Sequence, residues 1–137
     1  MKGYKVVTKI QLRFRDLDAI GHVNAPVYFS YLELGRLEMF NRMAGKKMKL
    51  QEIDFIVGRL EGDYLAPVVL GDELTLGTRL VSLGRTSCVV EQLLEANGKP
   101  AFKAREVLVF IDREKKSKKP VPGYVLDGAA EFMTKED

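Results

Sequence analysis

The sequence predicts an α+β domain in which a curved antiparallel sheet wraps around one long helix. Three features lead to this prediction: alternating polarity over residues 6–14, an apolar helical pattern over about 25–43, and consecutive strand patterns over 53–111. One helix followed by a run of strands is typical of the α+β class. A length of 137 residues corresponds to about one domain, so residues 1–137 are expected to form a single unit.

The first two elements are a strand and the long helix. The strand is expected over Val6–Phe14, where apolar and polar residues alternate. The helix is expected over about residues 25–43, with Asn24 as its cap, Pro26 in its first turn and Ala44-Gly45 at its end. Its apolar positions gather on one broad face. They are Tyr28, Phe29, Leu32, Gly35, Met39, Phe40 and Met43.

Strand patterns resume after the helix and predict an antiparallel meander. They cover Ile53–Leu65, Leu74–Leu80, Ser87–Leu94 and Phe102–Ile111. Turns are expected at Gly84-Arg85 and at Asn97-Gly98, the second of which is a strong hairpin signal. A weaker helical pattern spans Leu126–Met133. The outer face of such a sheet would stay partly apolar, so we expect a homodimer or a homotetramer.

The composition excludes several kinds of function. A net charge of +3 is too small an excess to argue for a nucleic-acid partner. Cys88 is the only cysteine and His22 the only histidine, which excludes an intrachain disulfide and multi-histidine metal sites. Residues 1–8 lack the apolar stretch of a signal peptide, and the nearly apolar run 64–70 is too short to cross a bilayer. We expect a cytoplasmic protein with no membrane partner.

Asp16, Asp18 and His22 lie in the segment that joins the first strand to the helix N-terminus. A helix N-terminus offers unpaired N–H groups that can stabilise a developing oxyanion. Because Pro26 has no N–H, the usable donors at the helix start narrow to residues such as Ala25 and Val27. A carboxylate beside such donors could attack a carbonyl or activate a water, which is a minimal site for acyl transfer.

Three other interpretations of this segment stay open. A D-x-D loop is often turn chemistry, in which aspartate side chains bond to nearby amides. His22 could fix the loop by hydrogen bonding rather than act as an acid or base. Asp16 and Asp18 could bind Mg²⁺, but no third carboxylate lies at a suitable spacing, so no metal is expected.

The segment Arg13–Arg36, R-F-R-D-L-D-A-I-G-H-V-N-A-P-V-Y-F-S-Y-L-E-L-G-R, resembles the signature of hot-dog-fold acyl-CoA thioesterases of the 4-hydroxybenzoyl-CoA thioesterase type. The shared elements are D-x-D-x-x-G-H-V-N, the tyrosines that follow it, and Glu33 and Arg36. The rest of the chain agrees in element order and length. The resemblance implies a single hot-dog domain that pairs into dimers, often dimers of dimers.

By position, the resemblance implies that Asp18 is the catalytic carboxylate, acting as nucleophile or general base, and that the Ala25 backbone N–H is the oxyanion donor. It implies that Gly21 permits close approach of the thioester, and that His22 and Asn24 shape the site. Many relatives read H-V-N-N, whereas here an alanine replaces the second asparagine. That change leaves a backbone donor but removes a side-chain contact, so the acyl preference stays open.

The resemblance also implies contacts with the substrate. Arg85, Thr86 and Ser87 lie where relatives contact coenzyme A, and Tyr28 is expected to line the acyl pocket together with Tyr31 and Phe55. The lysines of residues 115–119 could meet the CoA phosphates or could simply be a solvated tail. Glu33 and Arg36 are expected to pair along the helix. Coenzyme A is part of the substrate, and no separate cofactor is expected.

The main hypothesis is therefore an acyl-CoA thioesterase. Two alternatives are a thioesterase acting on acyl carrier protein, for which the basic tail would suit an acidic partner, and a non-catalytic acyl-CoA binding protein. A hot-dog dehydratase is less favoured, because such enzymes pair a histidine with a helix acid and the only histidine here lies in the aspartate loop. A fold alone does not decide among these chemistries.

Overall fold

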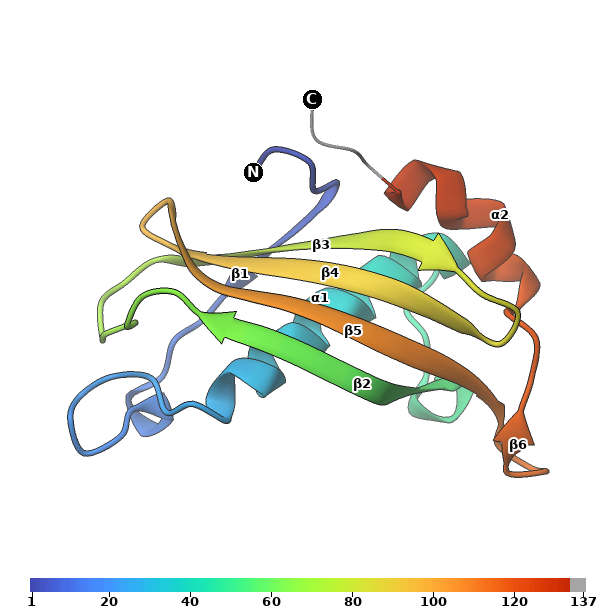
Figure 1. Cartoon of the computed structure of the whole chain (residues 1–137), viewed down its shortest axis with the longest axis horizontal. Helices are drawn as coiled ribbons and strands as arrows, with labels where there is room; N and C mark the ends of the chain where they lie inside the picture. Colours follow the sequence, from blue (N-terminus) through green and yellow to red (C-terminus); the bar gives the residue numbers. More distant parts are fainter. Residues whose placement is uncertain (134–137) are drawn as a thin grey trace.

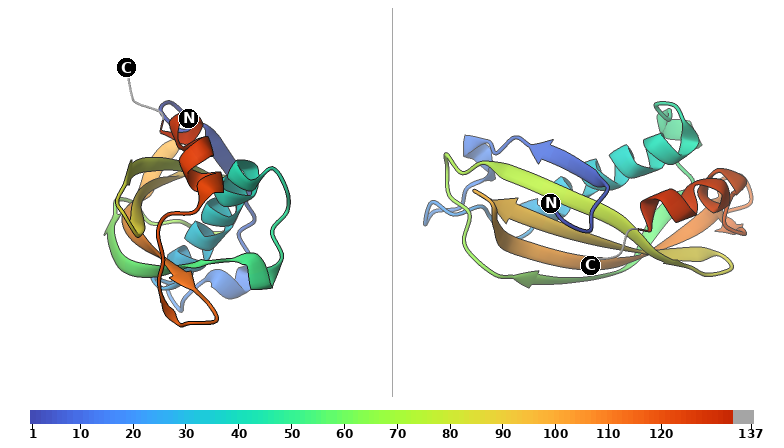
Figure 2. Two further views of the ribbon diagram at one scale, coloured as in Figure 1. Left: turned by 90° about the vertical axis from the view of Figure 1, so that its right-hand side faces the viewer. Right: turned by 90° about the horizontal axis from the view of Figure 1, so that it is seen from above.

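A computed structural model describes residues 1–133 as one curved antiparallel sheet and two helices (Figure 1). The strand order is β1-β3-β4-β5-β2, with β6 paired to the far end of β5. The elements are β1 Val6–Ile10, α1 Val27–Ala44, β2 Phe55–Tyr64, β3 Leu74–Leu83, β4 Ser87–Ala96, β5 Lys99–Asp112, β6 Ser117–Lys118 and α2 Gly123–Phe132, with short 3-10 turns at Phe14–Asp16 and Leu50–Glu52. The sheet curls around α1, as expected, and α2 covers one end (Figure 2).

The first strand and the helix both differ from their expected bounds. β1 ends at Ile10, and Phe14 lies in a 3-10 turn with its side chain 79% exposed, because the chain turns away from the sheet before it. The helix begins at Val27, with Pro26 at the N-cap position and no side-chain cap. The expectation that Asn24 caps the helix is therefore wrong. Its backbone carbonyl accepts the Val27 N–H instead (2.9 Å).

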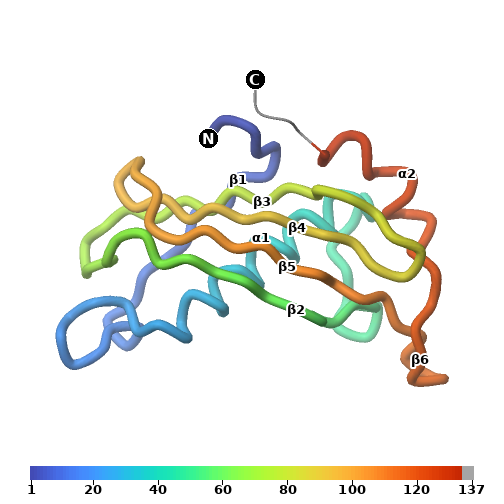
Figure 3. Tube along the Cα trace, viewed as in Figure 1, coloured from blue at the N-terminus to red at the C-terminus, as the bar shows by residue number. Residues whose placement is uncertain are grey.

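The meander after α1 follows the expected pattern. β3 and β4 join through Gly84–Thr86, and β4 and β5 join at Asn97-Gly98, whose positive φ angles of 52° and 80° suit a tight hairpin. Irregular register in all three long strand pairs, for example between Leu80 and Ser82, adds the local twist that curves the sheet. α2 begins at Gly123, three residues before the expected start. Figure 3 shows the continuous path of the backbone through these turns.

A row of buried polar side chains divides the core. One apolar cluster surrounds Phe40 under α2, and the other surrounds Leu32 near the start of α1. Between them, Thr78, Gln92 and Glu106 cross three adjacent strands on the face toward α1, and all are fully buried. The helix lies close to this row at Gly35, where an added Cβ would lie 2.4 Å from the Thr78 hydroxyl and 2.7 Å from the Gln92 amide nitrogen. A side chain larger than hydrogen would push the helix away.

Arg36 joins this row from the helix. Its guanidinium forms a buried ion pair with Glu106, so the expected pairing of Arg36 with Glu33 along the helix is wrong. Gln92 donates to the Leu32 carbonyl and to Thr78, both at 3.0 Å. Within the described chain, the amide oxygen of Gln92 and the second carboxylate oxygen of Glu106, Oε2, have no hydrogen-bond partner.

The edge strand β2 is poorly covered. It pairs with β5 on one side only within residues 1–133, and eight of its ten residues are exposed. Phe29, expected on the buried face of the helix, is 43% exposed because that flank of α1 also lacks a covering element. Neither helix of the described chain has the length and apolarity needed to cross a bilayer.

Candidate active site

The loop that carries the second aspartate folds as a tight turn. The Asp18 N–H donates to the His22 carbonyl (2.8 Å), and the Gly21 N–H donates to the Asp18 carbonyl (3.0 Å). Gly21 has a φ of 90°, which a side chain would strain. A bridge between His22 and Val69 ties this turn to the segment that follows β2. The position of Asp18 is thus fixed by backbone contacts rather than left to a free loop.

One oxygen of the Asp18 carboxylate has no hydrogen-bond partner within residues 1–133, and Asp18 lines a cavity. Its Oδ1 accepts the backbone N–H groups of Ile20 (2.9 Å) and His22 (3.2 Å), whereas Oδ2 accepts none within residues 1–133. The residue is exposed to solvent. The cavity has a volume of about 310 Å³ and is lined by Asp18, His22, Val23, Ala25, Tyr28, Tyr64, Leu65, Ala66 and Pro67. Four of the expected site residues, Asp18, His22, Ala25 and Tyr28, therefore share it.

Ala25 lines the same cavity and has an unpaired backbone donor. Its N–H makes no hydrogen bond within the described residues, because Ala25 precedes the first helical residue, Val27, and has no acceptor inside the helix. The Val27 N–H, the other expected donor, is taken by the Asn24 carbonyl. Its carbonyl accepts the Tyr64 hydroxyl (2.8 Å). The amide before a helix start is a suitable donor for an oxyanion.

Tyr64 is a site residue that sequence analysis missed. It comes from the end of β2, 39 residues after Ala25, and no local pattern marks it. Its ring packs edge-on against Tyr28 (5.1 Å between centroids) and tilted against Phe102 (4.7 Å). Burial and the neighbouring Tyr64 raise the pKa of Tyr28, so Tyr28 stays neutral at physiological pH. The aromatic pair gives the cavity an apolar wall with a polar rim.

Other expected residues are placed differently. Asn24 is exposed and absent from the cavity lining, and its backbone N–H donates to the Asp16 carbonyl (2.8 Å). Tyr31 is buried and bonded to Asp16 rather than exposed to the cavity. Both oxygens of Asp16 are taken by Arg13 and Tyr31, so the two aspartates do not form a shared cation site. No cluster of three metal-ligating side chains occurs anywhere in residues 1–133.

The residues expected to contact CoA lie far from Asp18 in the same chain. Arg85 and Thr86 occupy the β3–β4 turn at the right in Figure 1, whereas the aspartate loop lies at the left. β3 alone separates these ends by about 33 Å. The basic hairpin around residues 115–119 lies at the same end as Arg85. One chain therefore does not bring the expected CoA-binding residues to its own aspartate.

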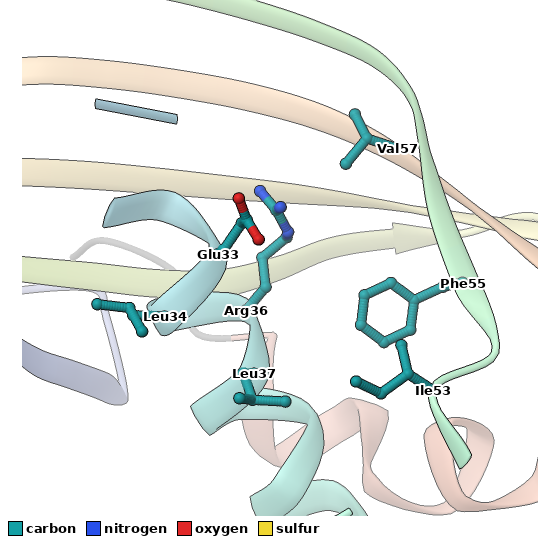
Figure 4. Close-up of a pocket in the computed structure, with 7 residues that line it drawn as sticks. All are labelled: Glu33, Leu34, Arg36, Leu37, Ile53, Phe55 and Val57. Carbon is teal, nitrogen blue, oxygen red and sulfur yellow. The ribbon is translucent and has the colours of Figure 1, made fainter. Parts of the chain in front are cut away.

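A second cavity of about 310 Å³ separates α1 from the start of β2 (Figure 4). It is lined by Glu33, Leu34, Arg36, Leu37, Ile53, Phe55 and Val57. Phe55, expected in the acyl pocket, lies here rather than beside Asp18.

The Cys88 thiol faces neither cavity. It is fully buried, and burial raises its pKa to about 12, so Cys88 is an unreactive core residue.

Comparison with known families identifies the family of the chain. A family model matches residues 12–131, which include the aspartate loop, both cavities and most of the sheet. The chain belongs to the thioesterase-like superfamily. This confirms the expected thioesterase family and its hot-dog fold.

Individual members of the thioesterase-like superfamily resemble the chain over most of its length. The long-chain acyl-CoA thioesterase FadM of Escherichia coli (strain K12) is 32% identical over 108 residues, 77% of this chain and 82% of FadM. The acyl-CoA thioester hydrolase YbgC of Escherichia coli O157:H7 is 26% identical over 126 residues, 90% of this chain and 92% of YbgC. The prediction of a thioester hydrolase is confirmed at the level of the family.

Solved structures of thioesterases are also similar to this chain. A thioesterase from Thermus thermophilus, crystallised with coenzyme A and Zn, is 41% identical to this chain and superposes with a TM-score of 0.88. The match covers 97% of both chains. A predicted thioesterase from Bacillus stearothermophilus, 24% identical with a TM-score of 0.87, shares the fold over 96% of this chain and 98% of its own.

Proposed function

We propose that the chain hydrolyses acyl-CoA thioesters to a carboxylic acid and free CoA. The observation that carries this proposal is that one cavity is lined both by Asp18, which has an oxygen free of hydrogen bonds, and by Ala25, whose N–H is unpaired within residues 1–133. Two acyl-CoA thioesterases among the relatives and a CoA complex among the similar structures support the choice of thioester.

In the proposed reaction, Asp18 Oδ2 attacks the thioester carbonyl carbon or takes a proton from a water that attacks it. In either case the carbonyl oxygen gains negative charge, and in this proposal the Ala25 N–H stabilises that charge. The C–S bond then breaks and the thiolate of CoA leaves. In the first route, water afterwards hydrolyses the mixed anhydride on Asp18 and restores the carboxylate. In the second route, the leaving thiolate takes the proton that Asp18 removed from water, which restores the carboxylate and gives free CoA. Both routes use only protein groups and water, with CoA entering as part of the substrate.

Thiol release from a panel of acyl-CoAs tests this function directly. The panel contains short, long, branched and aromatic acyl groups, with matching acyl carrier protein thioesters beside them. We expect many turnovers per chain on at least one acyl-CoA. Turnover only on the carrier-protein thioesters would show that the substrate is acyl carrier protein and not acyl-CoA. CoA binding without any turnover would show that the chain is an acyl-CoA binding protein and not an enzyme.

We further propose that the chain works as a homodimer joined through β2. The uncovered edge of β2 supports this, since an unpaired strand edge is a template for another strand. Antiparallel pairing of two β2 edges would also bring the Arg85 end of one chain toward the Asp18 end of the other. A site that needs both ends would then be complete only in the dimer. The expected homotetramer would require a second, different contact.

Replacing Val57 of β2 by lysine should weaken this dimer. Val57 is 42% exposed and lies on the α1 side of the strand beside Leu34 and Leu37, where a paired β2 and its own helix would cover it, so a charge there would be partly buried on pairing. The matched control is Leu126→Lys on α2, where the leucine is 56% exposed and lies away from β2. By sedimentation we expect the wild type and Leu126→Lys at twice the chain mass, and Val57→Lys with a larger monomer fraction and lower kcat/KM. An unchanged dimer with Val57→Lys would contradict pairing through β2.

A further inference from the structure

Asp16, the first aspartate of the D-x-D motif, is a buried carboxylate with several hydrogen bonds. Only 2% of its surface is exposed, although it lies two residues before the exposed Asp18. Its Oδ2 accepts the Arg13 backbone N–H (3.0 Å) and the Tyr31 hydroxyl (2.7 Å), and its Oδ1 accepts the Arg13 guanidinium (3.0 Å). The side chain therefore ties the start of the loop to the second turn of α1.

The main chain of Asp16 holds the other end of the loop. Its carbonyl accepts the N–H of Asn24 (2.8 Å), the residue directly before Ala25. A bridge between Leu17 and Val23 closes the same short hairpin. One residue thus contacts the segment before Asp18, the segment before Ala25 and the helix that follows both.

The protonation states of Asp16 and Tyr31 favour a strong hydrogen bond between the two side chains. Burial acts to raise the pKa of Asp16, but hydrogen bonds from Arg13 and Tyr31 outweigh it and hold the pKa below its usual range. Burial and the Asp16 carboxylate raise the pKa of Tyr31 above its usual range. At neutral pH a neutral hydroxyl therefore donates to a carboxylate, which is the stronger class of hydrogen bond.

We propose that Asp16 and Tyr31 are positioning residues that set the spacing between the Asp18 carboxylate and the Ala25 N–H. The inference rests on the proposed function, because that spacing matters only if both groups act on one carbonyl. Tyr31 lies in α1, so its bond to Asp16 fixes the loop relative to the helix start. A displacement of about 1 Å in a reacting group can cost about 100-fold in rate, so one anchoring hydroxyl can have a measurable effect.

The test compares two tyrosines that make the same kind of bond. Tyr124 of α2 donates to the buried Asp54 (3.0 Å) at the opposite end of the molecule. Tyr31→Phe and Tyr124→Phe each remove one hydroxyl, so a loss of general stability should lower the melting temperature in both. At a temperature where both are folded, we expect Tyr31→Phe to lower kcat about tenfold with little change in KM. We expect Tyr124→Phe to match the wild type.

Amide hydrogen exchange gives a readout independent of activity. In Tyr31→Phe we expect about tenfold faster exchange at Asn24 and His22, whose N–H groups hold the two ends of the loop. Tyr124→Phe should leave both rates unchanged. Equal kcat for the two variants, or unchanged exchange in Tyr31→Phe, would overturn the proposal. If the wild type hydrolyses no thioester, the proposed function fails while the exchange rates still decide whether Tyr31 holds the loop.

Discussion

Asp18→Asn should lower kcat by about 100-fold or more on every acyl-CoA that the wild type hydrolyses. Asparagine has nearly the same shape, and its amide oxygen can still accept the Ile20 and His22 N–H groups that hold the turn. It cannot act as a nucleophile or accept a proton from water at neutral pH. The measurement is thiol release under saturating substrate, together with CoA affinity and melting temperature, both of which should stay near the wild-type values.

Asp127→Asn is the matched control for this substitution. Asp127 is an exposed aspartate on α2, away from both cavities, so its replacement makes the same charge change without touching the site. We expect its kcat to equal that of the wild type. If Asp18→Asn keeps more than about a third of the wild-type kcat, Asp18 is not the catalytic carboxylate, and the assignment taken from its position fails.

Of the substitutions proposed for this chain, Arg36→Met should lower the free energy of unfolding most, by about 3–5 kcal/mol at neutral pH. Methionine keeps much of the apolar stem but leaves Glu106 buried and without its cation. The control is Arg42→Met on the same helix. Arg42 forms a half-exposed pair with Glu38 (2.9 Å), so its removal should cost less than about 1 kcal/mol. Urea unfolding of both variants measures the difference.

The loss in Arg36→Met should shrink as the pH falls. Burial raises the pKa of Glu106, and Arg36 opposes that rise, so removing the arginine raises the pKa further. A carboxyl whose pKa is higher in the folded state costs no stability below its unfolded pKa and costs progressively more as the pH rises. The stability gap to the wild type should therefore be smaller at pH 5 than at pH 7.5. Adding Glu106→Gln should recover part of the loss at pH 7.5; an equal gap at both pH values would contradict an uncompensated Glu106 charge.

Local patterns in the sequence predicted most of the fold. The Gly45 helix end, the Asn97-Gly98 hairpin and the alternating strands depend on neighbours within a few residues, and the structure reproduces them. The errors at Phe14 and Asn24 have one cause. Phe14 is a residue type common in strands and Asn24 one common at helix caps. The 3-10 turn that ends at Asp16, and the hydrogen bond from the Asn24 N–H to the Asp16 carbonyl, redirect the chain between them.

The candidate site was predictable only where its residues are close in sequence. Asp18, His22, Ala25 and Tyr28 span eleven residues, so one loop and one helix start bring them to a common cavity. Tyr64 and the Arg36–Glu106 pair depend on contacts across 39 and 70 residues, which no local pattern encodes. The expected Glu33–Arg36 pair failed for the same reason: helix spacing allows it, but a carboxylate of β5 lies opposite Arg36.

The buried row of Thr78, Gln92 and Glu106 has a consequence for the register of α1. Apolar contacts are non-directional, so two apolar clusters alone would tolerate sliding of the helix along the sheet by a turn, about 5.4 Å. The Arg36 ion pair and the Gln92 bond to the Leu32 carbonyl are satisfied at one axial position only. The first residue of α1 lies about 14 Å along the helix axis from Arg36, so fixing Arg36 on this row also fixes the position of the helix start. The middle of the core therefore fixes how far the start of α1 extends toward the candidate site.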